Sequence, residues 1–338
     1  MVTEANGKQA CTSFSVVTRR RFISLLGAAA AVPSFGNAEI KSEQLALCAS
    51  VGADLTHYDV DVAAATLTQR ETVRLPANVQ YAWPHRSRRY LYVASSDTAT
   101  GLNVTPGRTH HVTAFRIDDS GRLTPHGRAI ALPSRPIHLT TDTSSEHVLV
   151  TFNSPSAVRV YRINSDGTLG DEVRQREAIE AGVYGHQVRV TSNDRVAILV
   201  TRGNDAAGGR PEDPGALKVF RYRNGLLTAE VSIAPNGGYG FGPRHLDFHP
   251  TKPWIYVSRE RENALSLFVL AGDRVRPEPG FTKDTLSSRP APRQLAGAVH
   301  VHPNGRFVYG VNRADAVTDV DGKRVFADRK STRLNSSH

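Results

Sequence analysis

The chain has 338 residues, of which 39% are hydrophobic and 22% charged, and it carries a formal net charge of +10. Half of this charge lies at the two ends, because residues 1–38 carry a net +3 and residues 328–338 a net +2, which leaves +5 between them. No run of Lys and Arg remains in that central part, so we expect no nucleic-acid partner. The remaining charge can still favour a small anionic ligand, because a cleft focuses the field of the protein.

Residues 1–38 have the features of an export signal. The segment Thr18–Phe22 matches the twin-arginine pattern, a mildly apolar run from Ile23 to Val32 follows, and small residues up to Ala38 suit a signal peptidase. The apolar run is shorter than the about 20 residues that cross a bilayer, so we expect no stable membrane insertion. The alternative is a basic, disordered start before a core helix. We predict a periplasmic or extracellular protein that is exported by the twin-arginine route.

Beyond this segment, strand-like runs separated by turns dominate the chain as far as Ala327. The runs are Ala46–Ser50, Leu55–Val60, Tyr90–Ala94, Val112–Ile117, His147–Phe152, Val158–Ile163, Val196–Val200, Leu217–Tyr222, Ile255–Ser258, Leu265–Leu270 and Phe307–Val311. Turn signals separate the runs, with Asp119-Ser-Gly121 as the first. Asp-Gly and Asn-Gly pairs at Gly167, Gly225 and Gly305 supply the positive φ of tight hairpins. No stretch is a convincing amphipathic helix of ten or more residues, which disfavours a parallel α/β sheet.

A short pattern recurs five times, ending at Val93, Val150, Val200, Val257 and Gly310. The steps are about 57, 50, 57 and 53 residues. A period of this size with several short strands indicates a β-propeller, in which blades stack around an axis and function sits at a mouth of the channel. The alternative is chance recurrence in an ordinary domain, which five copies in register disfavour. The blades are expected near 46–77, 78–132, 133–182, 183–240 and 241–295, with a sixth from about 296.

Two further segments stand out along the chain. The insertion Gly203–Gly215 is polar and rich in Gly and Pro, so we expect it on one rim of the propeller. Residues 328–338 match the translation of a common sequencing-library adapter, and we interpret them as an artefact. We therefore predict a signal at 1–38 and a C-terminally truncated propeller at 39–327. The natural chain is expected to continue past Ala327.

Four segments carry a family resemblance: Pro136–Asp142, Gly185-His186, Gly242–Pro250 and Ala298–Arg306. The segment Gly242–Pro250, Gly-Pro-Arg-His-x-x-Phe-His-Pro, is the strongest marker of the family. The chain resembles the lactonase-type seven-bladed β-propellers, the group of 6-phosphogluconolactonase and the fungal carboxymuconate-lactonizing enzyme, over 45–327. The resemblance implies an all-β, seven-bladed β-propeller, of which about six blades are present here.

The resemblance also implies a site. The muconate-cyclising relatives use a His, two Arg and a Glu from neighbouring blades, and the matching positions here are His186, Arg244, Glu260 and Arg313. Arg binds carboxylates or phosphates bidentately and can stabilise the oxyanion of ester hydrolysis. His can pass protons, and Glu can orient or deprotonate water, particularly if burial raises its pKa. The alternative is that these groups only pair across the channel.

Other kinds of site are less well supported. His245, Asp247 and His249 have a spacing that could present metal ligands on one face of a strand, but His249-Pro250 recurs as His302-Pro303, which indicates a structural turn. There is no Gly-x-Ser-x-Gly elbow of a serine hydrolase and no phosphate-binding Gly loop before a helix. We expect no metal and no cofactor.

These observations predict an exported lactonase that hydrolyses a sugar-type or carboxylated lactone, as 6-phosphogluconolactonase does. Its partner would be a small anionic lactone, with Arg244 and Arg313 on the anionic group, His186 as acid and base, and Glu260 positioning water or its partner. A non-catalytic propeller that serves as a periplasmic binding scaffold, or a lactone-forming cycloisomerase, are the alternatives. An exported protein is not expected to meet 6-phosphogluconolactone, which is cytosolic. The particular lactone and the oligomeric state are left open.

Overall fold

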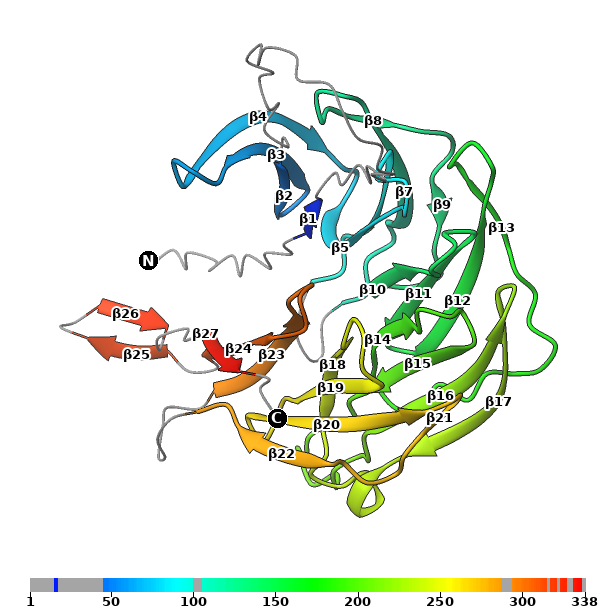
Figure 1. The fold of residues 1–338 in the computed structure, drawn as a ribbon, viewed down its shortest axis with the longest axis vertical. Helices are drawn as coiled ribbons and strands as arrows, with labels where there is room; N and C mark the ends of the chain where they lie inside the picture. Colours follow the sequence, from blue (N-terminus) through cyan, green and yellow to red (C-terminus); the bar gives the residue numbers. More distant parts are fainter. Residues whose placement is uncertain are drawn as a thin grey trace, which may run out of the picture.

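Six antiparallel sheets follow one another in chain order around a common centre in the computed structural model (Figure 1). The structure describes residues 45–99, 105–286 and 294–314, and the backbone of four further strands, β1 (Ser15–Val17), β25 (Val317–Val320), β26 (Lys323–Phe326) and β27 (Ser331–Asn335). The predicted all-β propeller is confirmed, with six blades at the predicted positions. The described residues contain one 3-10 helix, η1 (Pro235–Gly238), and no α-helix. None of their helices has the length and apolar character to cross a membrane.

Each sheet is a meander of up to four strands in chain order. The first has β1, β2 (Leu45–Val51), β3 (Asp54–Asp61) and β4 (Thr66–Arg74). The second has β5 (Asn78–Pro84), β6 (Tyr90–Ser96), β7 (His110–Ile117) and β8 (Leu123–Pro125), and β9 (Ile130–Ala131) also pairs with β7. The third has β10 (Pro136–Thr141), β11 (His147–Asn153), β12 (Ser156–Ile163) and β13 (Leu169–Glu172).

The later sheets repeat this order. The fourth has β14 (Gly185–Val190), β15 (Val196–Thr201), β16 (Ala216–Arg223) and β17 (Leu226–Ile233). The fifth has β18 (Pro243–Phe248), β19 (Trp254–Arg259), β20 (Ala264–Ala271) and β21 (Arg274–Val275), and β22 (Phe281–Asp284) also pairs with β20. The sixth has β23 (Gln294–Val301), β24 (Phe307–Ala314) and β27, and β25 and β26 form a separate hairpin.

The first strands of successive blades line the centre. β5, β10, β14, β18 and β23 contact one another from blade to blade and lie innermost in Figure 1. The second strands come next, and the five anchors of the sequence repeat all lie on them, from Val93 on β6 to Gly310 on β24. Outer strands such as β4 are mostly exposed. The repeat therefore marks the same structural position in each blade.

Apolar side chains are buried between blades rather than within them. Each of five clusters joins two successive sheets, and one example packs Leu149 and Val160 of the third sheet against Leu199 and Phe220 of the fourth. A single blade has nothing to cover its two faces, so the stack is the unit that folds. The turns expected at Gly121, Gly167, Gly225 and Gly305 are also confirmed, because all four glycines have positive φ.

The predicted limits of the domain stay predictions. β1 lies within residues 1–38 and pairs with β2, and β27 lies within residues 328–338 and pairs with β24. The twin-arginine segment Thr18–Phe22 lies outside the described residues.

Candidate active site

The innermost strands share an irregularity that the sequence pattern does not reveal. The register of each shifts near its start, between Val79 and Tyr81, Pro136 and His138, Gly185 and Gln187, Pro243 and His245, and Ala296 and Val299. A β-bulge places an extra residue outside the ladder and redirects its side chain. The extra residue is His186 on β14 and Arg244 on β18. Two of the four predicted site residues therefore occupy equivalent bulges of adjacent blades.

The other two predicted residues lie at the same end of the channel. Glu260 follows the last residue of β19, and Arg313 is the next-to-last residue of β24. Second strands run antiparallel to inner strands, so their ends meet the bulged starts of β14 and β18. We call this mouth, defined by His186, Arg244, Glu260 and Arg313, the arginine end.

All four predicted residues are in contact. Glu260 Oε1 lies 3.2 Å from Arg244 Nε and also binds Arg313 Nη2. Arg244 Nε in turn lies 3.2 Å from His186 Nε2. The convergence expected from the family pattern is present, whereas their catalytic role stays a prediction.

One further arginine was missed by the sequence analysis. Arg202 directly follows β15 and donates from Nε to Glu260 Oε2. Its position after a second strand matches that of Glu260 one blade later, which is the only signal that could have indicated it. Three guanidinium groups thus surround one carboxylate that is 5% exposed.

The carboxylate of Glu260 is ionised by this arrangement. Burial acts to raise the pKa of Glu260, but the three guanidinium groups and the hydrogen bond from Arg202 lower it below its ordinary value. The raised pKa that would make Glu260 a base for water is therefore absent. Its oxygens are occupied by arginine donors, so Glu260 is placed to hold the guanidinium groups together.

His186 is neutral in this setting. Burial holds the pKa of His186 well below its usual range, and the neighbouring charges of Arg244 and Arg313 act in the same direction. An arginine N–H can only donate, so Nε2 of His186 accepts and its proton resides on Nδ1. Among the described residues, that buried Nδ1 has no hydrogen-bond partner.

Two more buried histidines continue inward from His186. The ring of His245 lies 5.0 Å from that of His186, and the ring of His138 on β10 lies 6.2 Å from His245. His138 is fully buried against Tyr81, and neither of its ring nitrogens has a hydrogen-bond partner within the described part of the chain. Burial lowers the pKa of all three histidines well below the ordinary value. The middle of the channel therefore holds a row of uncharged imidazoles.

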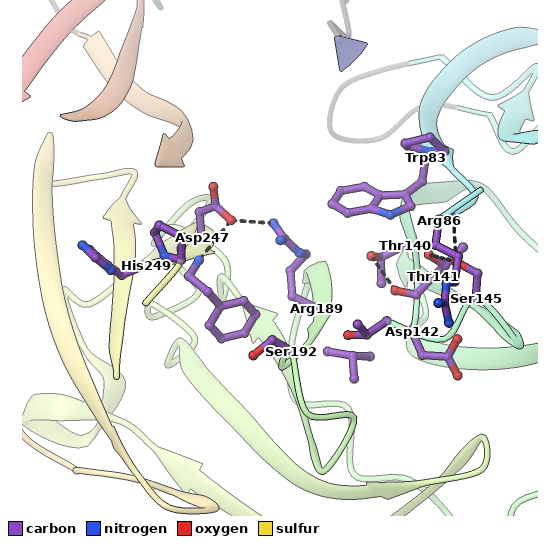
Figure 2. Close-up of a pocket in the computed structure, with 15 residues that line it drawn as sticks. Trp83, Arg86, Thr140, Thr141, Asp142, Ser145, Arg189, Ser192, Asp247 and His249 are labelled. Carbon is purple, nitrogen blue, oxygen red and sulfur yellow. Dashed lines mark hydrogen bonds and ion pairs between the residues drawn. The ribbon is translucent and has the colours of Figure 1, made fainter. Parts of the chain in front are cut away.

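A cavity of about 330 Å³ lies at the opposite end of the inner strands (Figure 2). We call this mouth the tryptophan end; it is defined by Trp83, Arg189, Asp247 and Phe248. The guanidinium carbon of Arg189 lies 4.7 Å from the Trp83 ring centre and 5.6 Å from that of Phe248. Arg189 Nη1 is also 3.1 Å from Asp247 Oδ1.

The carboxylate of the tryptophan end, Asp247, is satisfied by the protein itself. Asp247 accepts from the backbone N–H groups of Val301 at 2.8 Å and Phe248 at 3.0 Å as well as pairing with Arg189. A saturated pair of this kind holds blades together.

The metal-site alternative finds no support in the geometry. His249 Nδ1 accepts from the backbone N–H groups of Thr251 and Lys252, and its Nε2 lies 3.1 Å from the Gly305 carbonyl oxygen. His249 is therefore part of a turn, as the repeat of His-Pro indicated. The described residues contain no group of three or more His, Cys, Asp or Glu side chains arranged to hold a metal ion.

Comparison with known proteins agrees with the fold. Residues 46–329 match the family described as "Lactonase, 7-bladed beta-propeller". The chain is 28% identical over 258 residues to the 6-phosphogluconolactonase of Pectobacterium carotovorum subsp. carotovorum (strain PC1). This alignment covers 76% of this chain and 70% of that protein. The chain is 27% identical over 294 residues to the 6-phosphogluconolactonase of Bacillus subtilis (strain 168), with 82% and 78% covered.

A solved structure is similar as well. The periplasmic gluconolactonase PpgL of Pseudomonas aeruginosa superposes with a TM-score of 0.62 at 22% identity, covering 82% of this chain and 78% of that one. At this level of identity the likeness concerns the fold alone.

Proposed function

The chain belongs to the family of seven-bladed β-propeller lactonases, and on that premise we propose that it is a cofactor-independent lactonase that hydrolyses a sugar-type or carboxylated lactone. The observation that carries the proposal is the arginine end, where guanidinium groups held by one buried carboxylate lie beside a neutral histidine. The names of the relatives at 27–28% identity point to the same ester chemistry.

Arg244 and Arg313 bind the substrate in this proposal. Both contact Glu260, and the buried Nε of Arg313 has no hydrogen-bond partner within the described residues. Guanidinium donors fixed before the reaction stabilise the negative charge that develops on the carbonyl oxygen when water attacks the lactone. They also suit a carboxylate or phosphate on the substrate.

His186 moves the proton. Its Nε2 accepts from Arg244 in the free protein. When Arg244 turns to the substrate, the Nε2 lone pair becomes available to take a proton from the attacking water. The water oxygen bonds to the carbonyl carbon, the ring C–O bond then breaks, and the proton passes to the departing ring oxygen. The products are the open hydroxy acid and unchanged protein.

The test is hydrolysis of a panel of lactones by the protein and by His186→Gln, each rate corrected for spontaneous opening. We expect glucono-δ-lactone, 6-phosphoglucono-δ-lactone or a muconolactone to be opened, and the variant to be slower by about a hundredfold or more. Binding of the open acids without turnover of any lactone would instead support the binding-scaffold alternative, and cyclisation of a muconate would support the lactone-forming one.

Export by the twin-arginine route is a separate part of the proposal and rests on the segment Thr18–Phe22. The expected result is that the protein appears in the periplasmic fraction of a Gram-negative host. Replacement of Arg19 and Arg20 by Lys should retain it in the cytoplasm, and an unchanged distribution would contradict the assignment.

A further inference from the structure

A long connection covers part of the arginine end. Residues 203–215, which we call the strap, join β15 to β16, whereas the same connection takes only residues 154–155 between β11 and β12 and residues 260–263 between β19 and β20. The strap is an ordered hairpin, because Asp213 N donates to the Asn204 carbonyl at 3.0 Å and Asn204 Nδ2 donates to Asp213 Oδ2 at 2.8 Å. Gly203 at its base has φ +70, and a Cβ there would lie 2.2 Å from the Asp213 carbonyl oxygen.

Two carboxylates of the strap bind arginines at the arginine end. Asp205 Oδ2 accepts from Arg202 Nη2 at 2.7 Å, and Asp205 Oδ1 lies 2.5 Å from Arg261 Nε. Glu212 binds Arg261 Nη1 and accepts from the Gly240 backbone N–H at 2.8 Å. The strap therefore delivers negative charge to the outer side of the cluster around Glu260.

With the contact to Asp205, all three guanidinium nitrogens of Arg202 bind groups of the protein. Its Nε donates to Glu260, its Nη1 to the Gly203 carbonyl at 3.0 Å and its Nη2 to Asp205. The side chain is 12% exposed, so little of it remains for a ligand. The guanidinium groups left to meet substrate are those of Arg244 and Arg313.

The strap also lowers the charge of the site. Three guanidinium groups against the Glu260 carboxylate amount to a net +2. Addition of Arg261, Asp205 and Glu212 reduces the net charge to +1. A phosphate monoester carries about −1.5 to −2 at pH 7, whereas a carboxylate carries −1. Coulomb energy scales with the charge of the ligand, so the carboxylates of the strap weaken the attraction for a phosphate monoester up to about twice as much as that for a single carboxylate. A neutral lactone loses no attraction of this kind.

We propose that Asp205 determines the substrate class of this site, so that the protein prefers lactones with at most one negative charge over phosphorylated lactones. This inference rests on the proposed lactonase function and goes beyond it, because the curated relatives carry the name 6-phosphogluconolactonase. Asp205 touches arginines and not the reacting atoms, so it acts as a specificity-determining residue through the field at the site.

The experiment compares kcat/KM for glucono-δ-lactone and 6-phosphoglucono-δ-lactone in the wild-type protein, Asp205→Asn and Asp213→Asn. Asp213 is a matched control, since it lies in the same strap and contacts Asn204 rather than an arginine. We expect the wild type to favour the unphosphorylated lactone. Asp205→Asn should raise the relative kcat/KM for the phosphorylated lactone by about tenfold, and Asp213→Asn by less than about twofold.

A second measurement separates failure of this inference from failure of the proposed function. Calorimetric binding of 6-phosphogluconate and gluconate requires no turnover, and Asp205→Asn should shift the ratio of the two affinities toward the phosphorylated acid. If both lactones are hydrolysed and both ratios are the same in the wild type, Asp205→Asn and Asp213→Asn, the strap does not set the substrate class. A wild type that favours the phosphorylated lactone would also overturn the inference. Hydrolysis of no lactone in the panel, muconolactone included, would overturn the lactonase proposal, while the binding ratios would still decide the effect of Asp205.

Discussion

The two ends of the central channel use the same inner strands and similar residue types for different purposes. At the tryptophan end, one arginine meets one carboxylate, and the remaining acceptors of Asp247 are filled by backbone N–H groups. At the arginine end, one carboxylate meets three arginines, so positive charge is left over. An arginine–carboxylate contact by itself therefore does not indicate a site. An excess of arginine donors over carboxylate acceptors, as at the arginine end, is what indicates a site.

The bulges explain why the difference arises on the same strands. At the start of β14 and β18, His186 and Arg244 stand outside the ladder, whereas Arg189 and Asp247 near the ends lie in regular register with β15 and β19. A regular strand alternates its side chains between two faces, and Arg189 reaches Asp247 of the fifth blade and Trp83 of the second. The predictions below test this contrast.

The largest expected effect is on stability at the arginine end. Glu260→Gln leaves three buried or half-buried guanidinium groups without their shared counter-charge, which should lower the free energy of unfolding by about 3–5 kcal/mol. Asp247→Asn removes the partner of a single arginine and should cost distinctly less. Urea unfolding of both variants at pH 7 measures the two losses, and equal losses would remove the contrast.

Activity should also depend on the arginine end and not on the tryptophan end. Arg244→Ala should reduce kcat/KM for the preferred lactone by about a hundredfold or more, because a charge-assisted interaction that strengthens as the oxyanion develops is lost. Arg189→Ala, at the other end, should change kcat/KM by no more than a few-fold per folded molecule. Steady-state kinetics with a melting curve for each variant decide this. Full activity of a folded Arg244→Ala protein would remove Arg244 from the mechanism.

The histidine row between the two ends should make the fold sensitive to acid. His138, His186 and His245 have folded-state pKa values well below 6.5 because of burial, so the unfolded chain binds more protons in this range. Stability should therefore fall as pH drops below about 6.5, by about 1.4 kcal/mol per pH unit for each histidine. Unfolding measured between pH 6.5 and 5 avoids the titration of the carboxylates.

His138→Phe is the control for this slope. His138 makes no hydrogen bond to the described residues and packs on Tyr81, so an aromatic replacement keeps the packing and removes one titrating group. The variant should lose about one third of the contribution that the three histidines make to the slope. A slope identical to that of the wild type would show that His138 is not buried in its neutral form.

The smallest expected effect concerns metal at the tryptophan end. His249 and Asp247 are occupied by backbone groups, so addition of EDTA or of zinc should change Tm by less than about 1 °C. A zinc-dependent rise of several degrees that His249→Asn abolishes would revive the metal-site alternative.

The sequence alone was sufficient to predict the propeller and its blade limits. The strand prediction found the second and third strands of most blades, because strands covered on both sides, such as β15, are continuous apolar runs. It did not find β14 or β18, whose buried positions include His186, Gln187 and His245. Inner strands face the axis and carry polar side chains, so their hydrophobic pattern is weak.

The site shows the same division between local pattern and tertiary structure. His186, Arg244, Glu260 and Arg313 were identified because short family motifs surround them, and the structure brings them into contact. Arg202 was not identified, since its partner Glu260 is 58 residues away and only the stacking of blades brings them together.

Protonation states were decided by the tertiary structure alone. Burial lowers the pKa of His186. For Glu260, burial raises the pKa and three neighbouring guanidinium groups lower it, and the guanidinium groups have the larger effect. The sequence by itself therefore determined where the second and third strands form and how they repeat, because burial on two faces is a local pattern. Which charges meet at the axis was decided only by the stacking of the blades around it, because electrostatic contacts depend on distance in space and not along the chain.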